Sequence, residues 1–204
     1  MQRRTANFGH GNRYRRFAAK PVPYGGKWVG TDISAEQIAQ AKRLSVGLDI
    51  DYEAVAAENI NFPAESFDVI TACQCFWYFD HSKIMPNLYR MLKPHGKLLI
   101  LYMAWLPYED EIAGRSEELV LKYSPAWSGA GETVHPIQVP DCYRQKFEMF
   151  HREEYLLNVH FSRDSWNGRM KACRGVGASL SCGRIAGVGI RTPENAFGNS
   201  PGRI

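Results

Sequence analysis

The fold is set by the stretch Lys27-Trp28-Val29-Gly30-Thr31-Asp32-Ile33-Ser34, which is followed by residues 35–42. Its aromatic and β-branched residues are typical of a short buried strand that stops at Asp32. Ser34 is a good N-cap for a helix, and Gln37 three residues later completes a capping box. An open α/β sheet places the acid that binds a ribose between a strand and a helix of this kind. The pattern therefore makes Asp32 the first candidate for function.

The same residues resemble a known family. Residues 30–38, Gly-Thr-Asp-Ile-Ser-Ala-Glu-Gln-Ile, resemble the second motif of class I S-adenosylmethionine-dependent methyltransferases, in the methyltransferase type 11 group. The likeness continues to about Ser181. The resemblance implies that Asp32 binds the ribose hydroxyls of the cofactor and that Ile33 packs on its adenine. The stretch alone leaves a second interpretation open, an ordinary strand-to-helix turn with a solvated aspartate.

Composition bounds the class of protein. A chain of 204 residues with 45% hydrophobic residues can bury a core and fits one domain better than two. No apolar run approaches the roughly 20 residues of a membrane span, and residues 1–20 contain no apolar segment of a signal peptide. The five cysteines have irregular spacings that support neither a disulfide framework nor a metal site. We therefore expect a cytoplasmic protein without membrane contact or bound metal.

Charge is distributed unevenly along the chain. Residues 1–31 hold seven Lys and Arg and no acid, and residues 168–204 hold six Lys and Arg and one acid. Basic tails on an acidic body can contact nucleic acid. The tails lack a regular array of aromatic residues for base stacking, however, so nucleic-acid binding ranks third among the functional hypotheses.

The N-terminal segment should contain the first strand and a glycine-rich loop. Residues 7–13 have the outline of the family's acid-x-Gly-x-Gly-x-Gly loop, with Gly9 and Gly11 as candidates for cofactor binding. Asn7 stands in place of the acid and Arg13 in place of the last glycine. Residues 1–6 are too polar for the central strand of a parallel sheet. The sequence thus favours a first strand that is degraded or missing, and a chance Gly-x-Gly pair is an equal alternative to a working loop.

Downstream of Asp32 the pattern becomes regular. It predicts a helix over 35–45 and a strand over 50–54. By the resemblance, the following loop at residues 56–63 holds the adenine, with Ala57 and Glu58 as candidates and Ala56 at the position where the family has an acid. The other interpretation is a loop that faces water.

The next motif is the most specific one. Residues 66–72 predict a buried strand that continues into Cys73-Gln74-Cys75-Phe76-Trp77-Tyr78-Phe79-Asp80. This run resembles the fourth motif of trans-aconitate-methyltransferase-like enzymes. The resemblance implies that Gln74 and Cys75 lie near the methionine end of the cofactor, and Trp77 and Tyr78 near the acceptor. Four consecutive aromatic residues exceed what one core face can hold, so some should line a cavity or lid; an aromatic core cluster with structural thiols is the alternative.

The second half of the chain carries weaker signals. We expect a helix over 80–92, a turn at 93–96, a strand over 97–103, and an insert at 104–146 with an acidic helix near 108–123. Strands should follow at 147–151 and 155–161 and a helix at 162–171. Acceptor-pocket candidates in the insert are Trp105, Tyr108, Trp127 and His135. In the last helix, Trp166 and Arg169 resemble the family's Ser-Trp-x-Gly-Arg segment, where the arginine could clamp an acceptor carboxylate; a surface Arg packed on its neighbouring Trp is the alternative.

These signals predict an α/β fold, a doubly wound Rossmann-like and mostly parallel sheet with helices on both faces and with its N-terminal and C-terminal strands degraded or missing. The expected organisation is a degraded segment at 1–26, a methyltransferase-like domain at 27–181 and a disordered tail at 182–204.

The expected function is methyl transfer from S-adenosylmethionine to a small-molecule acceptor, at a carboxylate or hydroxyl oxygen. The alternative is a methyltransferase-like binding protein or incomplete fragment without activity. The sequence assigns no catalytic base and no oligomeric state.

Overall fold

The computed structural model describes residues 4–9, 26–173 and 202–203. The chain divides into two compact units. Residues 1–102 and 138–151 form one, which we call the sheet unit, and residues 103–137 and 152–204 form the other, the second unit. None of the helices in the described ranges is both long and apolar enough to cross a membrane.

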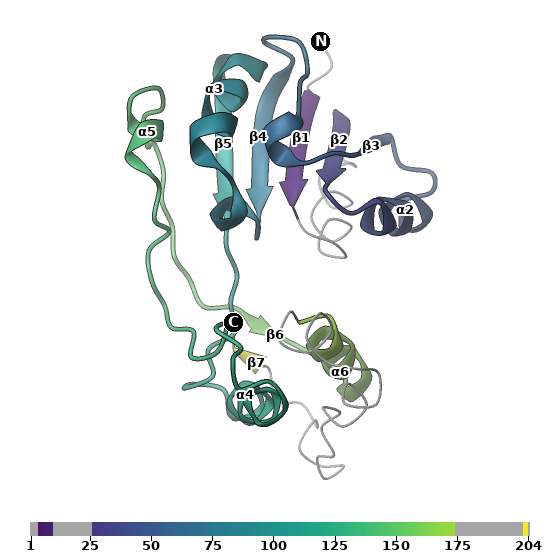
Figure 1. Ribbon diagram of the computed structural model, residues 1–204, viewed down its shortest axis with the longest axis vertical. Helices are drawn as coiled ribbons and strands as arrows, with labels where there is room; N and C mark the ends of the chain where they lie inside the picture. Colours follow the sequence, from purple (N-terminus) through teal and green to yellow (C-terminus); the bar gives the residue numbers. More distant parts are fainter. Residues whose placement is uncertain (1–3, 10–25, 174–201, 204) are drawn as a thin grey trace. The chain divides into compact units, whose positions relative to one another are not determined.

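The sheet unit is built on five parallel strands in the order β3-β2-β1-β4-β5 (Figure 1). The strands are β1 Arg4–Gly9, β2 Lys27–Asp32, β3 Ile50–Ala54, β4 Phe67–Cys73 and β5 Leu92–Leu101. The chain runs outward from β1 to β3 and then returns to β4 on the other side of β1. The predicted α/β class with a parallel sheet is therefore confirmed, and the strand order reverses beside β1, where open sheets of this class bind ligands.

The first strand corrects an expectation from the sequence. β1 lies at the centre of the sheet, where Asn7 is opposite Gly30 of β2 on one side and Thr71 of β4 on the other. The prediction that the N-terminal strand is degraded or missing is wrong. A central strand is held by backbone N–H and C=O groups that pair on both sides, so its place does not require a Val/Ile/Leu run.

Two helices follow strands of the sheet, and each begins with a side-chain cap, of which the one at Ser34 was predicted. In α2 Ala35–Leu44, the Ser34 hydroxyl accepts a hydrogen bond from the Gln37 N–H at 3.2 Å. In α3 His81–Met91, the Asp80 carboxylate accepts from the Ser82 N–H at 3.2 Å. Both predicted helices are confirmed, because the local capping signals and the apolar periodicity agree.

A close approach between neighbouring strands requires Gly30. Tyr52 of β3 is its direct partner, and a Cβ atom at Gly30 would lie 2.7 Å from the Tyr52 ring. The hydroxyl groups of Tyr52 and Ser45 are hydrogen-bonded at 3.0 Å, which ties β3 to the end of α2. The glycine of the second motif therefore has a packing role.

β5 is longer at its start than the sequence predicted. Phe67 pairs with Leu92 and Val69 pairs with Lys97, so the predicted turn at 93–96 is an irregularity within the strand. His95 adopts a left-handed conformation there, with φ of 64°. The strand ends at Leu101 instead of 103. Pro94 has no N–H to donate, which is why proline falls at such breaks in a ladder.

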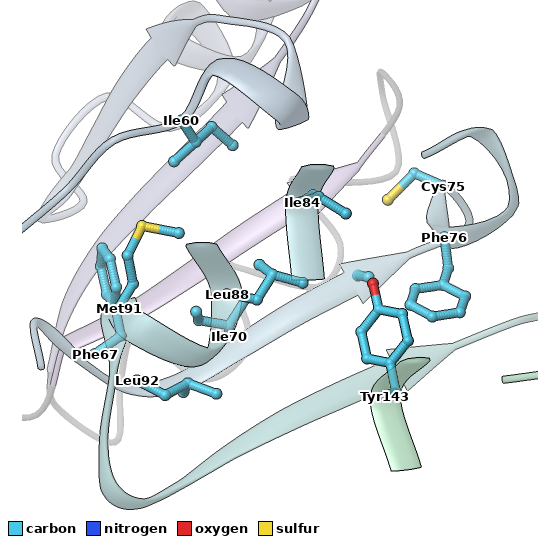
Figure 2. Packing of buried hydrophobic residues seen from close by; sticks show 11 residues of the cluster. Ile60, Phe67, Ile70, Cys75, Phe76, Ile84, Leu88, Met91, Leu92 and Tyr143 are labelled. Atoms are coloured by element: carbon cyan, nitrogen blue, oxygen red, sulfur yellow. The ribbon is translucent and has the colours of Figure 1, made fainter. Parts of the chain in front are cut away.

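The core of the sheet unit lies between α3 and the sheet, as Figure 2 shows. Ile84, Leu88 and Met91 share one face of α3 because they are four and three residues apart. We call the buried set the core cluster; its members are Ile60, Phe67, Ile70, Ala72, Cys75, Phe76, Ile84, Leu88, Met91, Leu92 and Tyr143. Tyr143 comes from the short helix α5 Asp141–Arg144, so a segment far along the chain completes this core.

The second unit contains two helices with side-chain caps. In α4 Glu111–Tyr123 the Asp110 carboxylate accepts from the Ala113 N–H at 2.7 Å, and in α6 Arg163–Lys171 the Ser162 hydroxyl accepts from the Ser165 N–H at 3.2 Å. Both predicted helices are confirmed. Their buried apolar residues Ala113, Val120, Trp166 and Met170 form what we call the α4–α6 cluster.

The strands predicted after the insert are mostly wrong. Residues 147–151 form no strand, and the prediction over 155–161 reduces to β6 Asn158–Val159, which pairs antiparallel with β7 Gly202–Arg203. A short alternating run becomes a strand only where another strand pairs with it. Most of the predicted tail at 182–204 lies outside the described residues, and the predicted domain boundaries stay predictions.

Candidate functional site

The site begins at the edge of the sheet where the strands end. β2 ends at Asp32, β1 at Gly9 and β4 at Cys73, and Gly9 is the register partner of Cys73. Because the three neighbouring strands are parallel, their carboxyl ends lie at one edge (Figure 1). This edge brings together the predicted cofactor residues of three separate motifs. Gly9 lies at this edge as the last residue of β1, whereas Gly11 lies outside the described residues.

Asp32 is a buried carboxylate, with 4% of its surface exposed. Its Oδ1 accepts a hydrogen bond from the Ser34 N–H at 2.8 Å, and its backbone carbonyl accepts from the Val55 N–H at 2.9 Å. The sequence assigned the Ser34 N–H to the Gln37 side chain of a capping box, and the structure gives it to Asp32 instead. The carboxylate is thus fixed by the turn between β2 and α2.

The side chain of Ile33, next to the buried Asp32, is exposed to solvent. Ile33 is 69% exposed although it directly follows a buried residue. An exposed branched apolar side chain beside a fixed carboxylate offers a surface for a flat ring next to a hydroxyl-binding group. This arrangement fits the roles that the resemblance implies for Asp32 and Ile33.

The loop after β3 forms the 3-10 helix η2 Ala57–Asn59. Ala57 is half-buried and packs against the core cluster. Glu58 accepts a hydrogen bond through Oε1 from the Asp80 N–H at 2.8 Å. The carboxylate is therefore engaged with the start of α3, a link that joins residues 22 positions apart and that no local pattern revealed.

Gln74 and Cys75 follow β4 directly. Gln74 is held in a left-handed conformation, with φ of 63°, and its N–H donates to the Leu101 carbonyl at 2.9 Å. A non-glycine residue in this region stores local strain, which clusters at functional sites. Cys75 is buried in the core cluster. Burial raises the pKa of the Cys73 thiol to about 11 and raises the pKa of Cys75 further above its usual range, so both remain protonated and unreactive at neutral pH.

The aromatic run divides between the core and the surface. Phe76 is buried, and its ring lies 4.6 Å from His81 and 5.3 Å from Tyr143. Trp77 and Tyr78 are 38% and 55% exposed, and Trp77 packs on Tyr102 with ring centroids 4.6 Å apart. The two residues predicted near the acceptor are thus the outward-facing members of the 3-10 helix η3 Phe76–Tyr78.

In the second unit, Trp166 and Arg169 both contact the Trp105 ring. The centroids of Trp105 and Trp166 are 5.9 Å apart, and the Arg169 guanidinium lies 4.7 Å from the Trp105 centroid. Trp166 is buried, and its indole N–H donates to the Ser116 hydroxyl at 2.9 Å. Its burial gives Trp166 a structural role in the α4–α6 cluster, while Arg169 stacks on an aromatic face as the alternative interpretation proposed, with Trp105 in place of the neighbouring Trp166.

The remaining acceptor candidates have separate surroundings. The Trp105 indole N–H donates to the Glu117 carboxylate. Tyr108 is largely exposed, Trp127 packs against the α4–α6 cluster, and His135 is bonded to Glu132 at 2.7 Å. These four side chains therefore do not form one polar site.

A cavity of about 380 Å³ lies elsewhere in the sheet unit. Its lining comes from Lys27 and Val29 of β2, three residues of β3, Phe62 and Phe67. Lys27 and Phe67 begin their strands, so this cavity is distinct from the edge that holds Asp32. Within the described ranges, no group of three or more His, Cys, Asp or Glu residues could hold a metal ion.

Comparison with known proteins finds a family match that includes the strand ends described above. Residues 7–100 match the family model described as "Methyltransferase domain". This part of the chain is therefore similar to methyltransferase domains. The match includes β1 from Asn7 onward, the β2–Asp32–α2 turn, η2, the aromatic run and nearly all of β5.

Two curated relatives show the extent of the likeness. The chain is 40% identical over 68 residues to the ubiquinone/menaquinone biosynthesis C-methyltransferase of Pseudoalteromonas translucida, covering 32% of this chain and 27% of that protein. It is 34% identical over 80 residues to the demethylmenaquinone methyltransferase of Thermus thermophilus, covering 38% of this chain and 36% of that protein. The chain thus spans less than two thirds of the length of these methyltransferase relatives.

Solved structures confirm the fold. The YcgJ protein from Bacillus subtilis aligns with a TM-score of 0.53 at 21% identity, over 92% of this chain and 75% of that one. At this identity the likeness concerns the fold alone.

The cofactor of this family is S-adenosylmethionine, and the residues of the edge fit it. The Asp32 carboxylate, fixed by its bond to Ser34, would supply an acceptor for ribose hydroxyls, and Ile33 has an exposed apolar side chain beside it. Asp80 was missed as a member of this region. Its N-cap signal, an Asp two residues before Ser82, was visible, but the bond to Glu58 was not.

Proposed function

We propose that this protein transfers a methyl group from S-adenosylmethionine to a small-molecule acceptor. The observation that carries the proposal is the pair Asp32 and Ile33. A buried carboxylate, fixed at the carboxyl end of β2 beside the central strand, is followed by an exposed apolar side chain within the methyltransferase domain. Ribose hydroxyls need a fixed acceptor and adenine needs an apolar surface, and these two residues offer both.

The cofactor side would be completed by residues from neighbouring strand ends. We assign cofactor contacts to Gly9, Gly11, Ala57, Glu58, Gln74 and Cys75 in addition to Asp32 and Ile33. Cys75 can contribute only through its backbone, because its thiol is buried in the core cluster. When bound, S-adenosylmethionine supplies an electrophilic methyl group. The task of the protein residues is then to hold the acceptor in line and to exclude water.

The acceptor side would be formed by the exposed members of the aromatic run. Trp77 and Tyr78 present ring surface next to the end of β4, and we place the acceptor against them. By the sequence resemblance alone, Arg169 and Trp166 are the candidates for an acceptor carboxylate, and within the second unit both residues contact the Trp105 ring. A carboxylate oxygen needs no general base to attack a methyl group, which agrees with a site in which we assign none.

The relatives favour a second kind of acceptor atom. One relative is a C-methyltransferase of ubiquinone and menaquinone biosynthesis, and the other acts as a demethylmenaquinone methyltransferase by name. A ring acceptor could stack on Trp77 and Tyr78, since contacts between aromatic rings are stabilising. Carbon methylation of an aromatic ring is therefore the second candidate reaction, next to methylation of a carboxylate or hydroxyl oxygen.

A thermal-shift titration separates an active cofactor site from a methyltransferase-like protein that has lost it. S-Adenosylmethionine and S-adenosylhomocysteine are added up to millimolar concentration, with ATP as the nucleotide control. We expect the two cofactor forms to raise the melting temperature, because a ligand at 100 times its Kd stabilises the native state by about 2.7 kcal/mol. No shift would favour the inactive alternative, which is motivated by Asn7 and Arg13 in the glycine loop.

Transfer of a labelled methyl group then identifies the acceptor atom. Carboxylic acids, phenols and quinols are offered with methyl-labelled cofactor, and the products are treated with base. Base-labile label indicates a methyl ester, whereas base-stable label on a ring carbon indicates the second candidate. A chain that binds the cofactor but transfers no label to any class contradicts the proposed small-molecule acceptors.

A further inference from the structure

A single carboxylate joins the segment after β3 to the start of α3. Glu58 lies in η2, and its Oε1 accepts a hydrogen bond from the Asp80 N–H at 2.8 Å. The Asp80 N–H belongs to the N-cap residue of α3, which has no partner within its own helix, so it needs an acceptor from elsewhere in the chain. Glu58 provides that acceptor.

On the cofactor side, η2 is attached directly to the residue that carries the proposed function. The Val55 N–H, two residues before η2, donates to the backbone carbonyl of Asp32 at 2.9 Å. A short run of backbone, residues 55–58, therefore links Asp32 to Glu58.

On the acceptor side, the bond holds one end of the segment Phe76–Phe79, which we call the aromatic turn. Phe76 anchors the other end in the core cluster, while Trp77 and Tyr78 between these anchors are exposed. The Asp80 carboxylate is itself engaged, because it caps the Ser82 N–H and pairs with Lys83 at 2.9 Å. The aromatic turn is thus fixed by apolar packing of Phe76 and Phe79 against the core cluster and, at its end, by the bond from Asp80 to Glu58.

We propose that Glu58 is a positioning residue that couples the cofactor side of the site to the aromatic turn. It acts through the Asp80 N–H, so occupancy of the cofactor side orders Trp77 and Tyr78 for the acceptor. The assignment of cofactor and acceptor to the two sides rests on the proposed function. The link between Glu58 and Asp80 rests on their hydrogen bond alone. Glu58→Gln keeps an oxygen that accepts this bond, and Glu58→Ala removes it.

The first arm of the test uses the protein without ligand. Hydrogen exchange is measured at the amides of residues 76–82 in the wild type, Glu58→Gln, Glu58→Ala and Glu53→Ala; Glu53 is an exposed carboxylate on β3 and serves as the matched control. We expect Glu58→Ala to exchange roughly tenfold to a hundredfold faster at Asp80, as loss of a bond to a charged acceptor implies. Glu58→Gln should remain within about twofold of the wild type. Equal exchange in Glu58→Ala and Glu53→Ala would overturn the positioning role.

The second arm adds S-adenosylhomocysteine and measures its Kd by calorimetry beside the exchange rates. In the wild type we expect the ligand to slow exchange in the aromatic turn severalfold. At ligand concentrations that saturate each variant by its own measured Kd, Glu58→Ala should show no slowing there, while Glu58→Gln should regain it. Equal slowing in wild type and Glu58→Ala would overturn the coupling. If the wild type binds no S-adenosylhomocysteine, the proposed function and the coupling fail, and the ligand-free arm still decides the positioning role.

Discussion

The core cluster of the sheet unit and the α4–α6 cluster of the second unit are built on different chemistry. The core cluster joins apolar side chains from strands, α3 and α5, with the Tyr143 hydroxyl as its polar atom, bonded to His81 Nδ1 at 3.1 Å. The α4–α6 cluster packs against two buried polar residues of α4, Ser116 and Glu117. Indole N–H groups are donors to both, Trp166 to Ser116 and Trp105 to Glu117.

The difference determines how each region should fail. An apolar core loses stability through the cavity left by a truncated side chain. A polar cluster loses stability when one partner is removed, because the other groups keep the cost of their burial without the bond.

The largest effect is expected from Phe67→Ala in the core cluster. The Phe67 ring is buried and packs edge-on against Phe62 at 5.2 Å between centroids. Its truncation should lower the free energy of unfolding by about 3–5 kcal/mol in urea denaturation. Val46→Ala is the control, since Val46 is 83% exposed and its truncation should cost less than about 0.5 kcal/mol. A loss below about 1 kcal/mol for Phe67→Ala would refute an apolar core at this position.

A smaller loss is expected from Glu117→Ala in the second unit. The Glu117 carboxylate accepts from the Trp105 indole and, at 2.7 Å, from the Gly131 N–H, so the substitution leaves two donors without their acceptor. The free energy of unfolding should fall by about 2–4 kcal/mol, and Glu117→Gln should fall between this variant and the wild type. Glu118→Ala is the matched control, an exposed neighbour on the same helix. Equal stability of the two alanine variants would show that the polar centre contributes nothing.

The smallest effect is a difference in the pH dependence of two histidines. Burial among aromatic rings lowers the pKa of His81, against the influence of Asp80 and Glu58. The pKa of His135 is raised, first by its hydrogen bond to the Pro136 carbonyl and then by Glu132. The unfolded chain therefore takes up a proton more readily than the folded chain at His81, and less readily at His135.

Acidification should thus act on the two units in opposite senses. As the pH falls below about 6.5, His81 should destabilise the fold. His135 stabilises it fully below about 6.5, and this contribution is lost as the pH rises through its folded pKa. Urea denaturation between pH 7.5 and 5.5 should show a smaller acid loss for His81→Gln than for the wild type, and a larger one for His135→Gln. The same change in both variants would contradict the contrast between the two environments.

The sequence predicted the parts of the fold whose signals are local. β2, Asp32 and α2 were predicted because a strand pattern, an N-cap and an apolar period coincide within residues 27–44. α3 and α4 were predicted from the composition and periodicity of their own residues, and α6 from the resemblance. The sequence could not predict β1, because its place depends on backbone pairing with β2 and β4 and not on an apolar run of its own.

The candidate site was predictable only in outline. The resemblance named Asp32 and Ile33, and the structure shows a buried and an exposed side chain at these positions. The environment of Trp166 depends on Ser116, which is 50 residues away, and that of Glu58 on Asp80, so no pattern within one helix could separate packing from ligand contact. Gln74 carried no sequence signal for its left-handed conformation.

Calorimetry of S-adenosylhomocysteine binding to Asp32→Asn tests whether Asp32 binds the cofactor. The amide oxygen of asparagine can still accept from the Ser34 N–H, so the turn and the melting temperature should change little, whereas Asp32→Ala removes both functions. We predict that Asp32→Asn weakens binding by roughly tenfold to a hundredfold, as expected for losing charge-assisted bonds to hydroxyl groups. A Kd equal to that of the wild type, in a folded Asp32→Asn variant, would show that the Asp32 carboxylate does not bind the cofactor.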